Sequence, residues 1–156
     1  ELSDAKACDD STKIYKVCAD QLQAFQSSLA EAKKQNKYLF VVVGAEWCPW
    51  CISLHHVLRE PGFGGDLANK FLVADIALFN GKSKLPEGEA VVAKLQQFSG
   101  DKRKLEGIPV LALVNPANSK AILINTAPLE QNTKTTKGHD PKKVSMAIEF
   151  SIVKIK

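Results

Sequence analysis

Several features that define whole classes of protein are missing from this sequence. Its apolar runs stay well short of the roughly 18 residues that a membrane-spanning helix requires, so we expect no membrane span. Internal repeats and low-complexity segments are absent, and a repeat architecture is therefore not expected. No glycine-rich phosphate loop is present, so we expect no organic cofactor.

An excess of charge of one sign is also lacking. Lys and Arg number 21 against 17 Asp and Glu, a net charge of +4. The lysines are scattered without a basic patch and interleaved aromatic residues, so we expect no nucleic-acid partner. The chain begins at Glu1 without a methionine or a signal-like segment. We interpret it as a trimmed, mature form whose export signal would already be gone.

What is present fits one compact domain over residues 1–156. The apolar share of 45% and the charged share of 24% are ordinary for a globular protein. A chain of 156 residues can bury a core without disulfides or metals. Its four cysteines therefore need a reason other than foldability.

The spacing of apolar residues predicts an α/β fold. Helix-type and strand-type patterns follow in the order helix, strand, helix, strand, helix, strand, strand, helix. The expected ranges are an extension over 1–14, a helix over about 15–37, strands over 38–43 and 71–78, a helix over 49–59, a helix containing 91–98, a strand pair over 109–114 and 121–124, and a helix from 141 onward. Strand-helix-strand units pair in parallel, and the final hairpin adds antiparallel strands. We therefore expect a central mixed sheet flanked by helices on both faces.

Cys48 and Cys51 carry the strongest chemical signal. They are separated by two residues, follow a buried strand and open a helix, which is the context of a redox-active Cys-x-x-Cys motif. A helix N-terminus presents unpaired N–H groups and a partial positive charge, so we expect it to lower the pKa of the Cys48 thiol. Cys51, one turn further on, should be less exposed and should attack the mixed disulfide that Cys48 forms with a substrate.

Two separated motifs resemble the thioredoxin superfamily. Residues 45–51 read Ala-Glu-Trp-Cys-Pro-Trp-Cys, which is similar to the family's tryptophan-led active site. Residues 107–111 read Gly-Ile-Pro-Val-Leu, which is similar to its Gly-Ile-Pro segment. The resemblance extends in element order over about residues 20–156. It implies a thioredoxin-like fold and a thiol-disulfide oxidoreductase, whose substrates are protein thiols and disulfides and whose own sulfurs do the chemistry.

The resemblance also implies how a substrate would bind. In the family the proline at the position of Pro109 is cis and faces the active-site disulfide, where it donates no hydrogen bond. Ile108 would offer its backbone to an extended peptide in the manner of an added strand. Trp47, Pro49 and Trp50 complete the expected substrate-binding set.

The chain departs from the family pattern before and between the cysteines. Val42 stands where thioredoxins bury an aspartate, so the family's proton acceptor for the resolving cysteine is missing. Glu46 either assists in that role or is a surface acid. Neither Pro49 nor Trp50 is the histidine found between the cysteines of strongly oxidising relatives, which favours a reductase over an oxidase or isomerase. The pattern resembles bacterial periplasmic members, so we expect a periplasmic or otherwise extracytoplasmic location, with a cytosolic role left open.

Metal binding is the alternative function. His55 follows Cys51 by four residues on the same helix face, where it either packs and tunes Cys51 or joins Cys48 and Cys51 as a zinc or copper ligand. A structural zinc site takes four ligands and the sequence offers no evident fourth, so we expect no bound metal. A non-catalytic interaction domain is a third function, against which the two intact motifs argue.

Cys8 and Cys18 form a second pair, which we interpret as a structural disulfide. Free buried thiols and a regulatory pair are the alternatives. The redox partner stays unidentified, and we expect a monomer. The chain shows no dimerisation domain, so we expect true isomerase activity to be weak. The loops over 80–88 and 126–139 are longer than a minimal thioredoxin needs, and loops beside a site often determine which partners bind.

Overall fold

Strand β1 (Tyr38–Gly44) is the centre of the fold because its side chains are buried on both faces of the sheet. The computed structural model describes residues 13–60, 63, 69–103, 105, 107–132 and 137–156. β1 pairs in parallel with β2 (Phe71–Ala77) and antiparallel with β5 (Val110–Asn115). β5 in turn pairs antiparallel with β6 (Lys120–Ile124), which gives the sheet order β2-β1-β5-β6.

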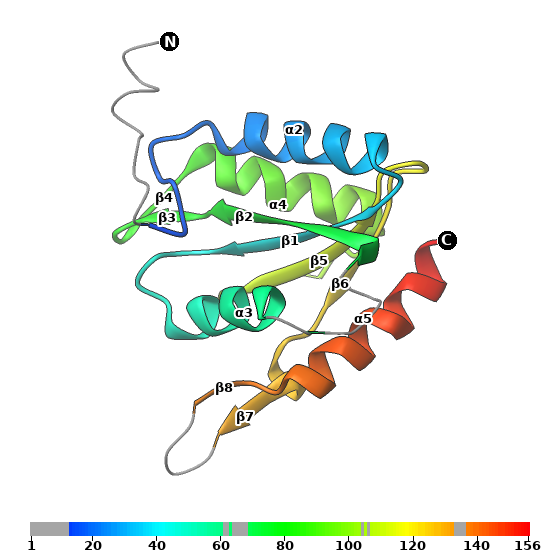
Figure 1. Cartoon of the computed structure of the whole chain (residues 1–156). Coiled ribbons are helices and arrows are strands. Elements are labelled where there is room, and N and C mark those ends of the chain that lie inside the picture. The colour runs from blue at the N-terminus through cyan, green and yellow to red at the C-terminus, as the bar shows by residue number, and fades with distance from the viewer. Residues whose placement is uncertain (1–12, 61–62, 64–68, 104, 106, 133–136) are drawn as a thin grey trace.

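Helices cover both faces of this sheet (Figure 1). α2 (Gln21–Lys34) and α4 (Pro86–Ser99) lie on one face, and α3 (Pro49–Arg59) and α5 (Pro141–Ile155) lie on the other. The alternation of side chains along β1 supplies both cores, since Val41 packs beneath α2 and α4 while Val42 packs beneath α3 and α5. The predicted mixed sheet between two helical layers is confirmed, and the architecture is a thioredoxin-like α/β fold.

Local sequence signals set the starts of three helices. Asp20 caps α2 by accepting from the N–H of Gln23, and Asp140 caps α5 by accepting from the N–H of Lys142. Pro49 occupies the first turn of α3, where a missing N–H costs nothing. The cap at Asp20 also corrects one expectation. The first helix was predicted to begin near residue 15, but residues 13–19 are not helical and lead into it.

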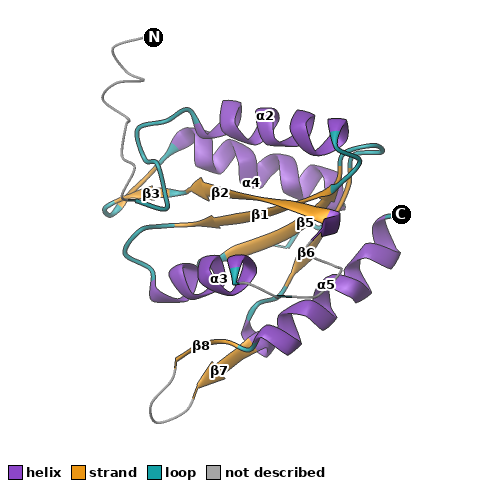
Figure 2. Cartoon of the chain, in the orientation of Figure 1, coloured by secondary structure: helices purple, strands orange, loops and turns teal. Residues whose placement is uncertain are grey.

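The two long polar loops contain short ordered elements (Figure 2). Strands β3 (Phe79–Asn80) and β4 (Ser83–Lys84) pair as one hairpin between β2 and α4. A 3₁₀ turn, η2 (Ala127–Leu129), precedes a second hairpin of β7 (Glu130–Asn132) and β8 (Lys137–His139). None of the helices within the described ranges combines the length and apolar character needed to cross a bilayer.

Candidate active site

The Cys48–Cys51 pair lies at the start of α3, just after the end of β1. Cys48 is the N-cap of α3, and its sulfur accepts a hydrogen bond from the N–H of Cys51 at 3.2 Å. The two cysteines are joined as a disulfide. Cys48 is 4% exposed and Cys51 is fully buried. The arrangement therefore places the Cys48 sulfur at the N-terminus of α3, beside the first N–H groups of the helix, and Cys51 one turn further on in the interior.

The two tryptophans of the motif each contact one of the short hairpins. Trp47 is 56% exposed, its indole N–H donates to the carbonyl of Gly81 at 2.8 Å, and its ring lies 5.7 Å from that of Phe79. Trp50 is partly buried, and its ring meets that of His139 edge-on at 5.7 Å. The β3–β4 and β7–β8 hairpins therefore flank the motif on two sides.

The second motif lies against the same cluster. Ile108 packs on the apolar group that contains Cys48 and Cys51, and its peptide bond to Pro109 is cis. A cavity of about 370 Å³ lies between the segment that leads into β5 and the residues that follow β6, and Pro109 and Asn125 are among its lining residues. The topology thus brings residues 45–51 and 107–111 together, although more than fifty residues separate them in the sequence.

Asp75 is a buried acid that the sequence analysis did not identify as a site residue. Its side chain is 8% exposed and accepts a hydrogen bond from the guanidinium of Arg59 at 2.7 Å. In the β1–β2 register Asp75 is the direct partner of Val42. The chain therefore carries a carboxylate one strand away from the position at which the family buries its aspartate. The available signal was a charged residue inside the otherwise apolar run 71–78.

His55 belongs to this charged cluster. Its Nδ1 lies 3.1 Å from a carboxylate oxygen of Asp75 and 2.8 Å from the guanidinium of Arg59. Burial lowers the pKa of His55 and Arg59 lowers it further, while Asp75 opposes both. Among the described residues, no group of three or more His, Cys, Asp or Glu side chains is arranged to hold a metal ion.

Glu46 connects the active-site loop to the segment that precedes α2. One of its carboxylate oxygens accepts from the backbone N–H groups of Ile14 and Tyr15, each at 3.0 Å. The buried side chain of Gln21 holds the same segment from the other side, because its amide donates to the carbonyl of Lys16 and accepts from the N–H of Ala77. Glu46 thus has a structural partner that the sequence did not indicate.

His139 ties the β7–β8 hairpin to α3. Its backbone N–H donates to the hydroxyl of Ser53 at 3.0 Å, and its Nδ1 lies 3.3 Å from the same oxygen. The ring is buried, and its Nε2 has no hydrogen-bond partner in the described part of the chain. Nothing in the sequence around His139 indicates this burial, because a histidine before an Asp-Pro helix start resembles a surface residue.

Burial makes His139 a source of acid sensitivity, because it lowers the pKa of the imidazole below the ordinary 6.5. Below about pH 6.5 the unfolded chain binds a proton that the folded chain does not, so the free energy of unfolding falls as the pH drops. One such group contributes at most about 1.4 kcal/mol per pH unit. We expect His139→Phe to reduce the slope of unfolding free energy against pH between 7 and 5, as measured by urea titration. A slope in His139→Phe equal to that of the wild type would contradict the assignment.

The predicted second disulfide falls partly outside the described residues. Cys18 lies in the segment before α2, is exposed and is a bonded cysteine. Cys8 is not among the described residues, so the Cys8–Cys18 pairing stays a prediction.

No protein-family model matches the chain, and no curated protein matches it. Among solved structures, the chain is similar to a disulphide isomerase from Xylella fastidiosa Temecula1, with 28% identity and a TM-score of 0.49. That likeness covers 67% of this chain and 72% of the other. It is also similar to a DsbH oxidoreductase, with 16% identity, a TM-score of 0.42, and coverage of 81% and 82% of the two chains.

Proposed function

We propose that the chain is a thiol-disulfide oxidoreductase that acts on protein substrates. The observation that carries this proposal is the Cys48–Cys51 pair at the N-terminus of α3, with Cys48 as the cap and Cys51 fully buried one turn later. Cys48 is the nucleophile, because the helix N-terminus stabilises its thiolate. Cys51 is the resolving cysteine, because burial keeps it from reacting with a substrate first.

The reductase cycle begins with both cysteines reduced. The Cys48 thiolate attacks one sulfur of a substrate disulfide, forms a mixed disulfide and releases the other substrate sulfur as a thiolate, which takes up a proton. The Cys51 thiolate then attacks the Cys48 sulfur, which forms the Cys48–Cys51 bond and releases the second substrate thiolate. The substrate has gained two electrons and the pair has lost two. A dithiol partner must supply two electrons to restart the cycle, and its identity is not proposed.

The substrate chain is proposed to bind across Ile108 and Pro109. The backbone of Ile108 offers hydrogen bonds to an extended peptide, and Pro109 keeps the approach to the sulfurs free of a competing donor. The exposed Trp47 and Pro49 and the partly buried Trp50 form the surrounding contact surface. The hairpins that Trp47 and Trp50 contact border this surface, which supports their role in partner choice.

Reduction is the proposed direction, and an extracytoplasmic compartment is the proposed location. The absence of a histidine between Cys48 and Cys51 supports the first. The resemblance of the motif to periplasmic proteins and the predicted Cys8–Cys18 disulfide support the second.

The test is the equilibrium of the Cys48–Cys51 pair in glutathione buffers, followed by the fluorescence of Trp47 and Trp50. A reduction potential near about −240 mV or below supports a reductase, and one near about −120 mV makes the protein an oxidant. Cys51→Ser should accumulate a mixed disulfide with a substrate, and Cys48→Ser should form none at this site and show no turnover. No transition in the wild type, or a retained metal that blocks it, would overturn the proposal in favour of a metal-binding module.

A further inference from the structure

The hydroxyl of Tyr15 is a buried donor without an acceptor. The side chain is 0% exposed, and its oxygen has no hydrogen-bond partner among the described residues. Buried polar groups in folded proteins are nearly always satisfied, so an orphaned hydroxyl needs a physical explanation. A neighbouring group whose strength as an acceptor changes with redox state would supply such an explanation.

The hydroxyl of Tyr15 and the sulfur of Cys51 lie on the same side of Gly44. A Cβ atom built on Gly44 would lie 2.6 Å from the sulfur of Cys51 and 2.7 Å from the hydroxyl of Tyr15, so the two groups border the same small space. Tyr15, Cys48 and Cys51 also belong to one buried cluster. In the disulfide state the Cys51 sulfur is neutral and a weak acceptor.

The active-site loop fixes the position of Tyr15 relative to Cys51. Glu46, two residues before Cys48, accepts from the backbone N–H groups of Ile14 and Tyr15. Ile14 packs against the same cluster as Tyr15. The Tyr15 ring therefore sits behind the disulfide through contacts made by the motif itself, and not by chance packing of a terminal segment.

The electrostatic surroundings keep the proton on the hydroxyl. Burial raises the pKa of Tyr15 strongly, Asp75 and Glu46 raise it further, and Arg59 opposes them. At neutral pH Tyr15 is therefore a hydrogen-bond donor and not a base. A donor beside a sulfur stabilises the thiolate, since a charged acceptor gives a stronger hydrogen bond than a neutral one.

Building on the proposed function, we propose that Tyr15 is a positioning residue whose hydroxyl donates a hydrogen bond to the Cys51 sulfur when the disulfide is reduced. Reduction by a thiol pair breaks the Cys48–Cys51 bond and gives each sulfur one electron, and Cys51 becomes a thiol or thiolate. Tyr15 keeps its proton throughout. The contact holds the Cys51 thiolate ready to attack the mixed disulfide on Cys48, and it is lost when the Cys48–Cys51 bond re-forms.

Tyr15→Phe tests this role because it removes the hydroxyl and keeps the ring. The loss of one hydrogen bond in the reduced state should shift the equilibrium with glutathione about tenfold toward the disulfide, a potential about 30 mV more negative. Resolution of the mixed disulfide should slow by a similar factor. The same variant should leave the oxidised protein as stable as the wild type or more stable, and the reduced protein less stable.

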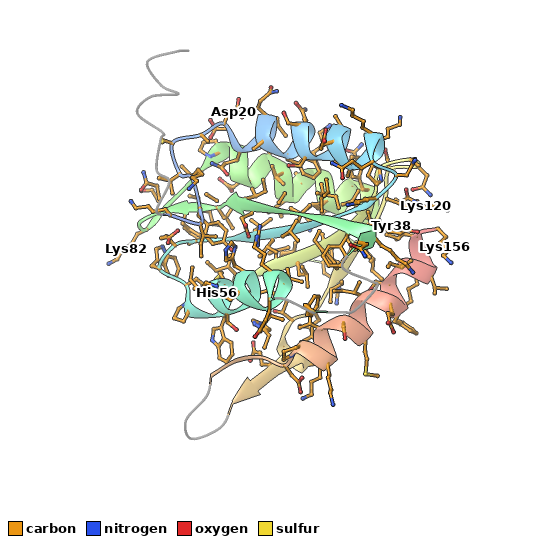
Figure 3. The ribbon with its side chains drawn as sticks, viewed as in Figure 1. Asp20, Tyr38, His56, Lys82, Lys120 and Lys156 are labelled. Atoms are coloured by element: carbon orange, nitrogen blue, oxygen red, sulfur yellow. A yellow bond between two sulfur atoms is a disulfide. The ribbon has the colours of Figure 1, made fainter. Side chains whose placement is uncertain are left out.

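Tyr38→Phe is the matched control, since Tyr15 and Tyr38 are the two tyrosines of the sequence. Figure 3 shows Tyr38 at the end of the sheet opposite Lys82 of the β3–β4 turn, far from the motif. The reduction potential of the Tyr38→Phe variant should equal that of the wild type. A Tyr15→Phe potential equal to the wild type, or equal stability changes in both redox states, would reduce Tyr15 to a packing residue. Absence of any transition in the wild type would instead refute the proposed function.

A second measurement covers the case in which Tyr15→Phe does not fold. Biosynthetic 3-fluorotyrosine in the Tyr38→Phe background labels Tyr15 alone and makes its hydroxyl a stronger donor. The potential should move toward less negative values, and the fluorine resonance should shift when the pair is reduced. An unchanged resonance together with an unchanged potential would overturn the inference.

Discussion

Arg59→Met is expected to lower the free energy of unfolding by about 2 kcal/mol. Asp75 is 8% exposed and its charge is balanced by the guanidinium of Arg59 at 2.7 Å. Only the Asp75 side of the pair is buried, since the Arg59 side chain is 38% exposed. Removing the guanidinium leaves a poorly solvated carboxylate with the His55 ring as its remaining polar neighbour, which is costly. Methionine retains the length of the stem, so lost packing contributes little. Denaturant titration at neutral pH measures the effect.

A second Arg–Asp pair in the same chain supplies the control. Arg103 and Asp101 form an ion pair at 2.6 Å at the surface, and exposed pairs contribute little. Arg103→Met should therefore leave stability close to that of the wild type. The double variant Arg59→Met/Asp75→Asn should recover most of the loss, because the unpaired charge is gone. Equal destabilisation by the two arginine substitutions would mean that burial of Asp75 is not the cause.

Gly44→Ala is expected to cost about 2–3 kcal/mol in the oxidised protein. The added methyl would lie 2.6 Å from the Cys51 sulfur and 2.7 Å from the Tyr15 hydroxyl, closer than atoms can approach. Forcing one extra carbon into a packed interior displaces its neighbours, at a cost of about 1–3 kcal/mol and occasionally more. Here the displaced neighbour is the resolving sulfur, so the rate of mixed-disulfide resolution should fall as well.

The double variant Gly44→Ala/Tyr15→Phe separates crowding from other effects. Removing the hydroxyl clears one of the groups that the methyl would meet, so part of the lost stability in the oxidised state should return. Thermal unfolding with the disulfide intact provides the comparison. Strictly additive effects of the two substitutions would show that the hydroxyl does not border this space.

Much of the fold was predictable because its signals are local. The apolar run that forms β1, the Pro49 at the start of α3 and the Asp140 cap of α5 each specify an element within a few residues of sequence. The hairpins were not predicted because strands of two or three residues carry no period, and they depend on distant partners such as Trp47 and Trp50.

The residues of the site were likewise predictable only where their signal is local in the sequence. The cysteine motif and the Gly-Ile-Pro segment are each an unbroken stretch of sequence, and both were identified from it. Tyr15, Asp75 and the anchoring role of Glu46 depend on contacts across tens of residues, which single-sequence patterns do not encode. Tyr15 was included in the expected helix, and its burial beside Cys51 arises because the chain enters α2 only at Gln21.

The two hydrogen bonds from Ile14 and Tyr15 to Glu46 bear on where the smallest active unit begins. A chain shortened to start at α2 would retain the sheet, four helices and both motif cysteines. It would lose Ile14 and Tyr15, which pack in the same cluster as Cys51, and the Cys51 sulfur would become accessible to solvent. The Glu46 carboxylate would lose the two N–H groups that bind it. Cys51 is fully buried and Cys48 is 4% exposed, and the proposed mechanism relies on this difference in access between the two sulfurs. A domain that began at the first helix would therefore retain the fold, but the proposed roles of Cys48 and Cys51 would no longer be separated by a difference in solvent access.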